Sequence, residues 1–252
     1  MLHPYHESLL SQLYPGSQPS STALQPAVRL FEERLNLSES RRHKIIWRVD
    51  GGFGSDDNVE WLIKRGYQVL AKGVSNRRAG KLASQVQRWH TLRSDRWIGS
   101  VPTPTVFSRP VHTFVVRRQR KHEDYAAYLY TTLPWPARKI ATLYDQRGGA
   151  ETEFRSDKSG GAHLDQRRKH KRHAQEAWIH LTDIAHNYLA WFQQHILADS
   201  PFAAFGHLRI SRDLFHIPGT IEMHDGRLLS VKLSKATPHA ADLLDCLSRF
   251  WQ

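Results

Sequence analysis

Apolar and polar positions follow patterns that predict a mixed α/β protein. Over residues 22–37 the apolar side chains are spaced as on one face of a helix. The run KIIWRVD at 44–50 is short, rich in β-branched residues and followed by two glycines, which is typical of a strand. The strongest helical pattern covers 174–197, and we expect its apolar stripe to face a hydrophobic core. The stripe consists of Ala177, Trp178, Leu181, Ile184, Ala185, Tyr188, Leu189, Phe192 and Ile196.

A strand–helix–strand unit is predicted over residues 44–73. Ser55 precedes two aspartates, as an N-cap does, and the helix that follows runs to Arg65 before Gly66 stops it. The segment YQVLAKG at 67–73 is a second strand. Two strands joined through a helix are expected to pair in parallel, which is how an α/β sheet begins.

Residues 74–135 are predicted to be mainly β. A short helix is expected near 78–88, and prolines separate the strands that follow. We interpret this segment as a β insertion or an extension of the sheet, not as an independent domain. Its strands are expected at 96–99, 113–118 and 125–133.

Two further segments complete the chain. After Pro136 a helix is predicted to reach about Lys158. The tail from 208 to 235 is expected to contain short strands around Pro218-Gly219 and a hairpin turn at Asp225-Gly226, and a helix is expected at 238–250.

The charge of the chain indicates a polyanionic partner. The 252 residues have a formal net charge of +12, and residues 41–173 contain 28 basic and 12 acidic side chains. Because the basic residues are clustered, as at 117–121 and 167–172, we favour nucleic acid over an anionic membrane or a surface that is basic only for solubility. The tryptophans Trp89, Trp97 and Trp135 are candidates for base stacking, although packed aromatics are more common.

Several classes of protein are excluded. The single cysteine rules out an internal disulfide framework and a cysteine-based zinc site. The sequence has no run of roughly 18 apolar residues and no signal-peptide pattern, so we expect neither membrane insertion nor secretion. The expected compartment is the cytoplasm.

Candidate chemistry is concentrated on the helix predicted after Pro136. At 100° per residue, Tyr144, Arg147, Glu151 and Lys158 fall within a sector of about 60°. A carboxylate flanked by cations stays ionised and can hold a divalent metal, while the cations can bind phosphate. The simpler interpretation is a salt-bridged helix face. The tyrosine on the polar face and the glycine pair inside the helix favour a binding site.

These residues resemble a known family. The spacing Y-x2-R-x3-E-x6-K is similar to the signature of the cut-and-paste DDE transposases of bacterial insertion sequences. The segment 48–73 resembles the part of those proteins that contains the second catalytic aspartate. The segment 212–235 is similar to their terminal β region, so the resemblance covers most of the chain.

The resemblance implies an α/β, RNase H-like catalytic domain that covers residues 1–252 and is incomplete at its N-terminus. Its RNase H-like core pieces would be 44–73 and 136–197. The mainly β insertion would be 74–135, and a C-terminal segment of a helix and short strands would be 200–252.

The resemblance also implies a site. Asp50 and Glu151 would be catalytic acids and ligands of Mg²⁺, with Mn²⁺ as a possible substitute. By resemblance, the reaction would be phosphoryl transfer at transposon ends. The protein would act as a homodimer that binds the transposon ends and target DNA, and no membrane partner is expected. Tyr144, Arg147 and Lys158 would contact DNA. The basic run is interpreted as a phosphate-contacting segment, with a solvated loop as the alternative; it includes Arg167, Arg168, Lys169, Lys171 and Arg172.

One departure from the family is informative. The family has a first catalytic aspartate before the second, whereas no Asp precedes Asp50 here. We therefore expect the C-terminal portion of a transposase with weak or no autonomous cleavage. The first alternative is a non-catalytic fragment that binds DNA or dimerises with full-length transposase and so modulates it. The second is a basic RNA-binding protein in which the spacing is accidental.

Overall fold

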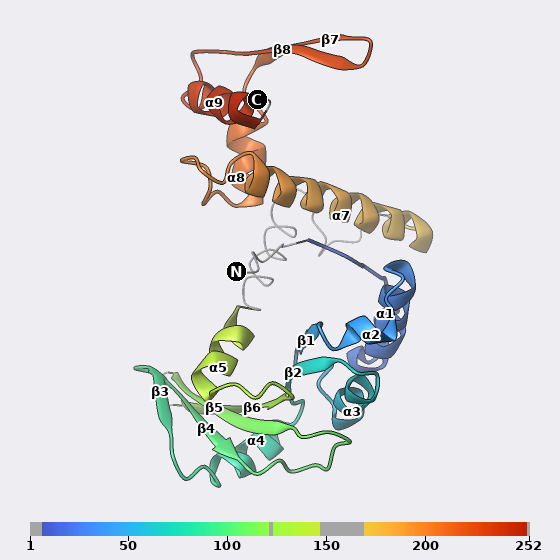
Figure 1. Ribbon diagram of the computed structural model, residues 1–252, viewed down its shortest axis with the longest axis vertical. Coiled ribbons are helices and arrows are strands. Elements are labelled where there is room, and N and C mark those ends of the chain that lie inside the picture. Colours follow the sequence, from blue (N-terminus) through green and yellow to red (C-terminus); the bar gives the residue numbers. More distant parts are fainter. Residues whose placement is uncertain (1–6, 121–122, 147–168, 251–252) are drawn as a thin grey trace. The chain divides into compact units, whose positions relative to one another are not determined.

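The computed structural model describes residues 7–120, 123–146 and 169–250, and the chain divides into two compact units (Figure 1). The sheet unit consists of Gln12–Gly149. The helical unit consists of Met1–Ser11 together with Ala150–Gln252. The helix predicted after Pro136 therefore begins in the sheet unit, whereas the helix predicted at 174–197 lies in the helical unit.

A mixed six-stranded sheet forms the centre of the sheet unit, in the order β1-β2-β6-β5-β4-β3. Among the described strands of this sheet, only β1 and β2 are parallel, as predicted, and every other neighbouring pair is antiparallel. Because β6 pairs with β2, the strands after residue 74 extend the first sheet rather than forming a sheet of their own. The strands are β1 (Ile46–Val49), β2 (Gln68–Lys72), β3 (His90–Arg93), β4 (Arg96–Val101), β5 (His112–Arg120) and β6 (Glu123–Thr131).

Helices cover both faces of this sheet, because alternate strand residues point to opposite sides. On one face, Val69 and Tyr130 pack against Leu62 and other apolar residues of α1, α3 and α4. On the other, Leu129 packs against Ile140 of α5, and Figure 1 shows α5 apart from α3 and α4. The helices of the sheet unit are α1 (Ser20–Arg34), α2 (Glu39–Arg42), α3 (Asp56–Lys64), α4 (Asn76–Ala83) and α5 (Ala137–Asp145). The mixed α/β fold class is confirmed, and it is consistent with an RNase H-like fold.

Local signals set the ends of α3 and α4. The Ser55 hydroxyl accepts a hydrogen bond from the Asn58 amide, and Gly66 follows the helix with a φ of 91°. Both features confirm the predicted helix. The helix expected near 78–88 instead spans Asn76–Ala83. It begins earlier because the Ser75 hydroxyl caps it by accepting a hydrogen bond from the Arg78 amide.

A buried carboxylate joins α1 to the sheet. The side chain of Glu32 is 9% exposed and forms ion pairs with Arg42 and Arg65, while the Tyr67 hydroxyl donates to it at 2.7 Å. Burial raises the pKa of Glu32, but the hydrogen bonds from Arg65 and Tyr67 outweigh it and leave that pKa below its usual range. Burial and the same carboxylate raise the pKa of Tyr67.

The helical unit contains a separate core. Phe192, Leu197 and Phe202 pack with Leu243 and Cys246 of α9. The hairpin predicted at Asp225-Gly226 is present, and both turn residues have positive φ, as a tight two-residue turn requires. The elements are α7 (Arg172–His195), α8 (His207–Arg209), the π-helix η1 (Ile210–Leu214), β7 (Gly219–His224), β8 (Arg227–Leu233) and α9 (Ala240–Phe250).

Within the helical unit, the predicted core-facing stripe of α7 is confirmed only at its C-terminal end. Phe192 and Ile196 are buried, but Leu181, Ile184 and Tyr188 are 61%, 66% and 56% exposed. The buried positions of the helix are instead Gln175, Thr182, His186, Ala190 and Phe192. Periodicity identifies an apolar face, but it does not determine whether the same compact unit covers that face.

No helix within the described parts of the chain combines the length and apolar composition needed to cross a bilayer.

Candidate active site

Asp50 directly follows β1, at the carboxyl end of the parallel pair β1 and β2. The chain turns sharply there, since the Phe53 amide donates to the Asp50 carbonyl at 2.9 Å. The Gly51 amide donates to Oδ1 of the Asp50 carboxylate at 2.6 Å. Ligands of open α/β sheets bind at the carboxyl ends of parallel strands, so this position suits a functional acid.

Tyr144 reaches the same carboxylate from α5. Its hydroxyl donates to Oδ1 of Asp50 at 3.5 Å. Two contacts hold α5 in this position: Nη1 of Arg48 donates to the Leu143 carbonyl at 3.1 Å, and Arg96 pairs with Asp145 at 2.5 Å. The structure thus brings together two residues that the sequence analysis assigned to one site.

The glycine-rich loop after Asp50 packs tightly against the sheet. A Cβ at Gly54 would lie 1.9 Å from the carbonyl oxygen of Lys72, which no side chain can occupy. The Asn58 side-chain amide donates to the carbonyls of Phe53 and Ser21, so α3 and α1 fix the loop together. Asp50 therefore extends from a rigid support rather than from a mobile turn.

Lys72 is a further candidate for the site, which the sequence analysis did not name. It ends β2, and since Val49 pairs with Ala71 in a parallel register, Lys72 lies across from Asp50. Its Cδ and Cε pass 3.6 and 3.7 Å from where a Cβ on Gly51 would be. The signal that identifies it is its place at the end of a strand predicted to be parallel to the first.

The metal-ligating groups around Asp50 fit a hard divalent cation only in part. Mg²⁺ prefers carboxylate oxygens, and the two hydrogen bonds described above orient the Asp50 carboxylate through Oδ1. The neighbouring acid on α5, Asp145, is paired with Arg96 instead. Among the described residues there is no group of three or more His, Cys, Asp or Glu that could hold a metal ion.

Other predicted site residues lie outside the described residues, in the segment 147–168. They are Arg147, Glu151, Lys158, Arg167 and Arg168. The helix face predicted to carry Tyr144, Arg147, Glu151 and Lys158 is therefore described only at Tyr144.

The described end of the basic run lies at the start of α7, in the helical unit. Lys169, Lys171 and Arg172 are all exposed, and Arg172 pairs with Glu176 at 3.1 Å. The positive end of the helix dipole lies at the same terminus. The basic side chains and the backbone amides there therefore both favour binding of an anion.

The candidate stacking tryptophans contact cations of this chain. The guanidinium of Arg117 lies 5.0 Å from the ring centroids of both Trp89 and Trp97. The ammonium of Lys139 lies 3.9 Å from the ring of Trp135. Cation–π contacts of this kind support packed aromatic side chains over base-stacking ones.

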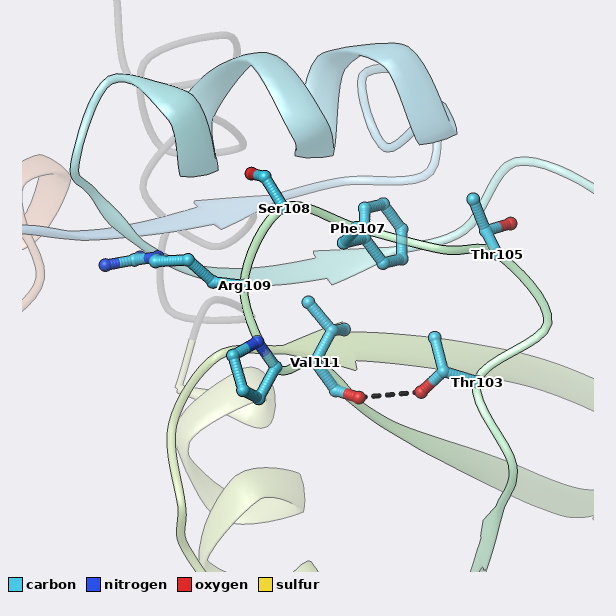
Figure 2. A pocket seen from close by; sticks show the side chains of 7 residues that line it. Thr103, Thr105, Phe107, Ser108, Arg109 and Val111 are labelled. Carbon is cyan, nitrogen blue, oxygen red and sulfur yellow. Dashed lines mark hydrogen bonds between the residues drawn. The ribbon is translucent and has the colours of Figure 1, made fainter.

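A pocket of about 380 Å³ lies in the loop between β4 and β5 (Figure 2). The Thr103 hydroxyl donates to the Val111 carbonyl at 2.7 Å across the loop, and Arg109 extends away to the Tyr67 carbonyl. Phe107 closes one side by packing edge-on against Tyr130. None of the predicted site residues lines this pocket.

Comparison with protein families gives a match over residues 3–252 to the family described as transposase DDE domain group 1. No curated protein matched the chain.

Proposed function

Because this chain belongs to the DDE transposase family, whose members act on DNA, we propose that it performs metal-dependent phosphoryl transfer at transposon ends with Asp50 and Glu151 as acids. The observation that supports this most strongly is the hydrogen bond from the Tyr144 hydroxyl to Oδ1 of Asp50. A strand end and a helix that are distant in sequence meet there, in the part of the chain that resembles the family's catalytic segment.

The residues of the site have separable roles in this proposal. Asp50 and Glu151 would hold a divalent metal, which when bound would supply activation of the attacking oxygen and stabilisation of the leaving oxygen. Tyr144 orients the Asp50 carboxylate. Lys72, beside the same loop, contributes positive charge for a DNA phosphate.

DNA is held by further cations in the proposal. Arg147 and Lys158 bind the backbone near the reacting phosphate. The basic run, Arg167 to Arg172, adds phosphate contacts that do not depend on base sequence. This chain supplies no Asp before Asp50, so we expect it to cleave DNA only slowly without a further acid.

Metal binding tests the acidic site without requiring turnover. Titration with Mn²⁺, followed by electron paramagnetic resonance, is expected to show a site that Asp50→Asn removes. Asp124→Asn, which changes an exposed acid on β6, is the matched control and should bind as the original chain does. Equal Mn²⁺ affinity in both variants would contradict the proposal.

A DNA assay separates the catalytic proposal from the non-catalytic alternative. Nicking of a supercoiled plasmid with Mg²⁺ or Mn²⁺ is compared with binding of a DNA duplex. Cleavage, however slow, should disappear in Glu151→Gln while binding persists. If Asp50→Asn and Glu151→Gln together change neither metal affinity nor nicking, the chain is a DNA-binding protein without this chemistry.

A further inference from the structure

The last residue of α5 is an acid at a position that a helix by itself disfavours. The carbonyl groups at the C-terminal end of a helix give that end a partial negative charge, which repels a carboxylate. Asp145 is the last residue of α5, and the last turn of the helix contains no basic residue to offset it. The stabilisation of Asp145 therefore comes from outside its own helix.

Arg96, at the start of β4, is the partner of this acid. Its Nη1 lies 2.5 Å from Oδ2 of Asp145, and the two side chains are 16% and 34% exposed. The neighbouring ion pair of Arg118 with Asp95 has side chains that are 46% and 40% exposed. Because water and salt screen a shielded pair less, the pair of Arg96 with Asp145 is the stronger constraint of the two.

The register of the sheet explains why Arg96 requires an acid. Arg93, Arg96 and Arg118 lie opposite one another on β3, β4 and β5, in one row across the sheet. Neighbouring strands are about 4.8 Å apart, and like charges opposite one another are unfavourable. Asp95, in the turn between β3 and β4, offsets Arg118, whereas the acid for Arg96 comes from α5. The row of arginines therefore attracts the end of α5 to β4.

A second arginine holds the same end of α5 from the far edge of the sheet. Nη1 of Arg48 on β1 donates to the Leu143 carbonyl at 3.1 Å, in the last turn of the helix. Strands β2, β6 and β5 lie between β1 and β4. The two residues that these arginines hold, Leu143 and Asp145, flank Tyr144 in the chain. The direction of the Tyr144 side chain is therefore set from both sides.

We propose that Arg96 is a positioning residue of the site, which holds the last turn of α5 through Asp145 so that the Tyr144 hydroxyl reaches Asp50. That hydrogen bond is long, at 3.5 Å, so a small displacement of the turn breaks it. The strands after residue 74 thereby support a contact between β1 and α5. The effect on metal binding rests on the function proposed above, whereas the effect on the position of Tyr144 does not.

Fluorine NMR of the full chain labelled with 3-fluorotyrosine tests the position of Tyr144. Tyr144→Phe identifies the Tyr144 signal by its loss. Arg96→Gln should shift that signal, and so should Asp145→Asn, which removes the same ion pair from the helix. Arg118→Gln is the matched control and should leave the signal unchanged, because it removes an ion pair of the same row that does not involve α5.

Thermal melting shows whether each variant is folded, and either folded variant of the pair decides the test. An unchanged Tyr144 signal in folded Arg96→Gln or Asp145→Asn would overturn the proposal.

Mn²⁺ affinity shows whether Arg96 acts through Tyr144. We expect Arg96→Gln to lower that affinity about fivefold, because the hydrogen bond to Asp50 is lost. In a Tyr144→Phe chain, Arg96→Gln should cause no further loss, since both changes remove one interaction. A full additional loss in that chain would refute the positioning role. If the original chain binds no Mn²⁺, the catalytic proposal fails, and the fluorine signal still decides whether Arg96 positions Tyr144.

Discussion

The Tyr144 hydroxyl donates to Oδ1 of Asp50 at 3.5 Å, although 94 residues separate the two. Tyr144→Phe removes this hydrogen bond and leaves the ring in place. We expect Mn²⁺ affinity to fall about fivefold, the equivalent of a net hydrogen bond of about 1 kcal/mol. Tyr125→Phe, which changes a half-exposed tyrosine on β6, should leave that affinity unchanged. An unaltered Mn²⁺ affinity in Tyr144→Phe would show that Tyr144 does not orient the Asp50 carboxylate for metal binding.

Lys72 is expected to bind a DNA phosphate beside Asp50. Lys72→Ala should weaken duplex binding and reduce the slope of log affinity against log salt by about 1, since one phosphate contact releases about one counterion. Fluorescence anisotropy at several salt concentrations measures this slope. Lys81→Ala, at an exposed position on α4, is the control. Equal slopes for the two variants would place Lys72 outside the DNA contact.

Glu32 is expected to be a major determinant of stability. Glu32→Gln leaves Arg42 and Arg65 without their carboxylate in a largely buried cluster, which should lower the free energy of unfolding by about 3 kcal/mol. Urea denaturation measures the difference. The neighbouring change Glu33→Gln is at an exposed position and should have little effect. Similar losses in both variants would show that the ion pairs are not responsible.

Asp56 should make stability depend on acid pH. Burial raises the pKa of its carboxyl, but hydrogen bonds from Thr105 and Arg78 outweigh this and lower that pKa. An acid whose pKa is lower in the folded chain stabilises it above the unfolded pKa, about 3.9, and that stabilisation is lost as pH falls through the folded value.

Asp56→Asn should therefore lower the free energy of unfolding by about 2 kcal/mol at neutral pH and flatten its decline below about pH 4. Denaturation at a series of pH values tests this. The adjacent Asp57→Asn, at an exposed position, is the control. A decline in acid that is equally steep in Asp56→Asn and the original chain would mean that other carboxyls cause it.

The features that could be predicted from the sequence are those that neighbouring residues determine. Ser55 and Gly66 set the ends of α3, and the Asp225-Gly226 turn sets the hairpin, since caps and tight turns depend on a few adjacent side chains. Asp50 is assigned as a candidate acid from the family resemblance, since a short strand that ends in an acid does not by itself indicate a catalytic residue. Its partner Tyr144 was identified from helical spacing and a family resemblance.

Only the tertiary structure decided which segments meet. The chain by itself determined its helices, strands, basic charge and the signature around Asp50 and Tyr144, because each depends on local order or composition. The antiparallel pairing of β6 with β2, the approach of Lys72 to the loop after Asp50 and the hydrogen bond from Tyr144 to Asp50 depend on contacts between distant segments. Such contacts follow from how surfaces bury one another in three dimensions, which the spacing of residues along one segment does not specify.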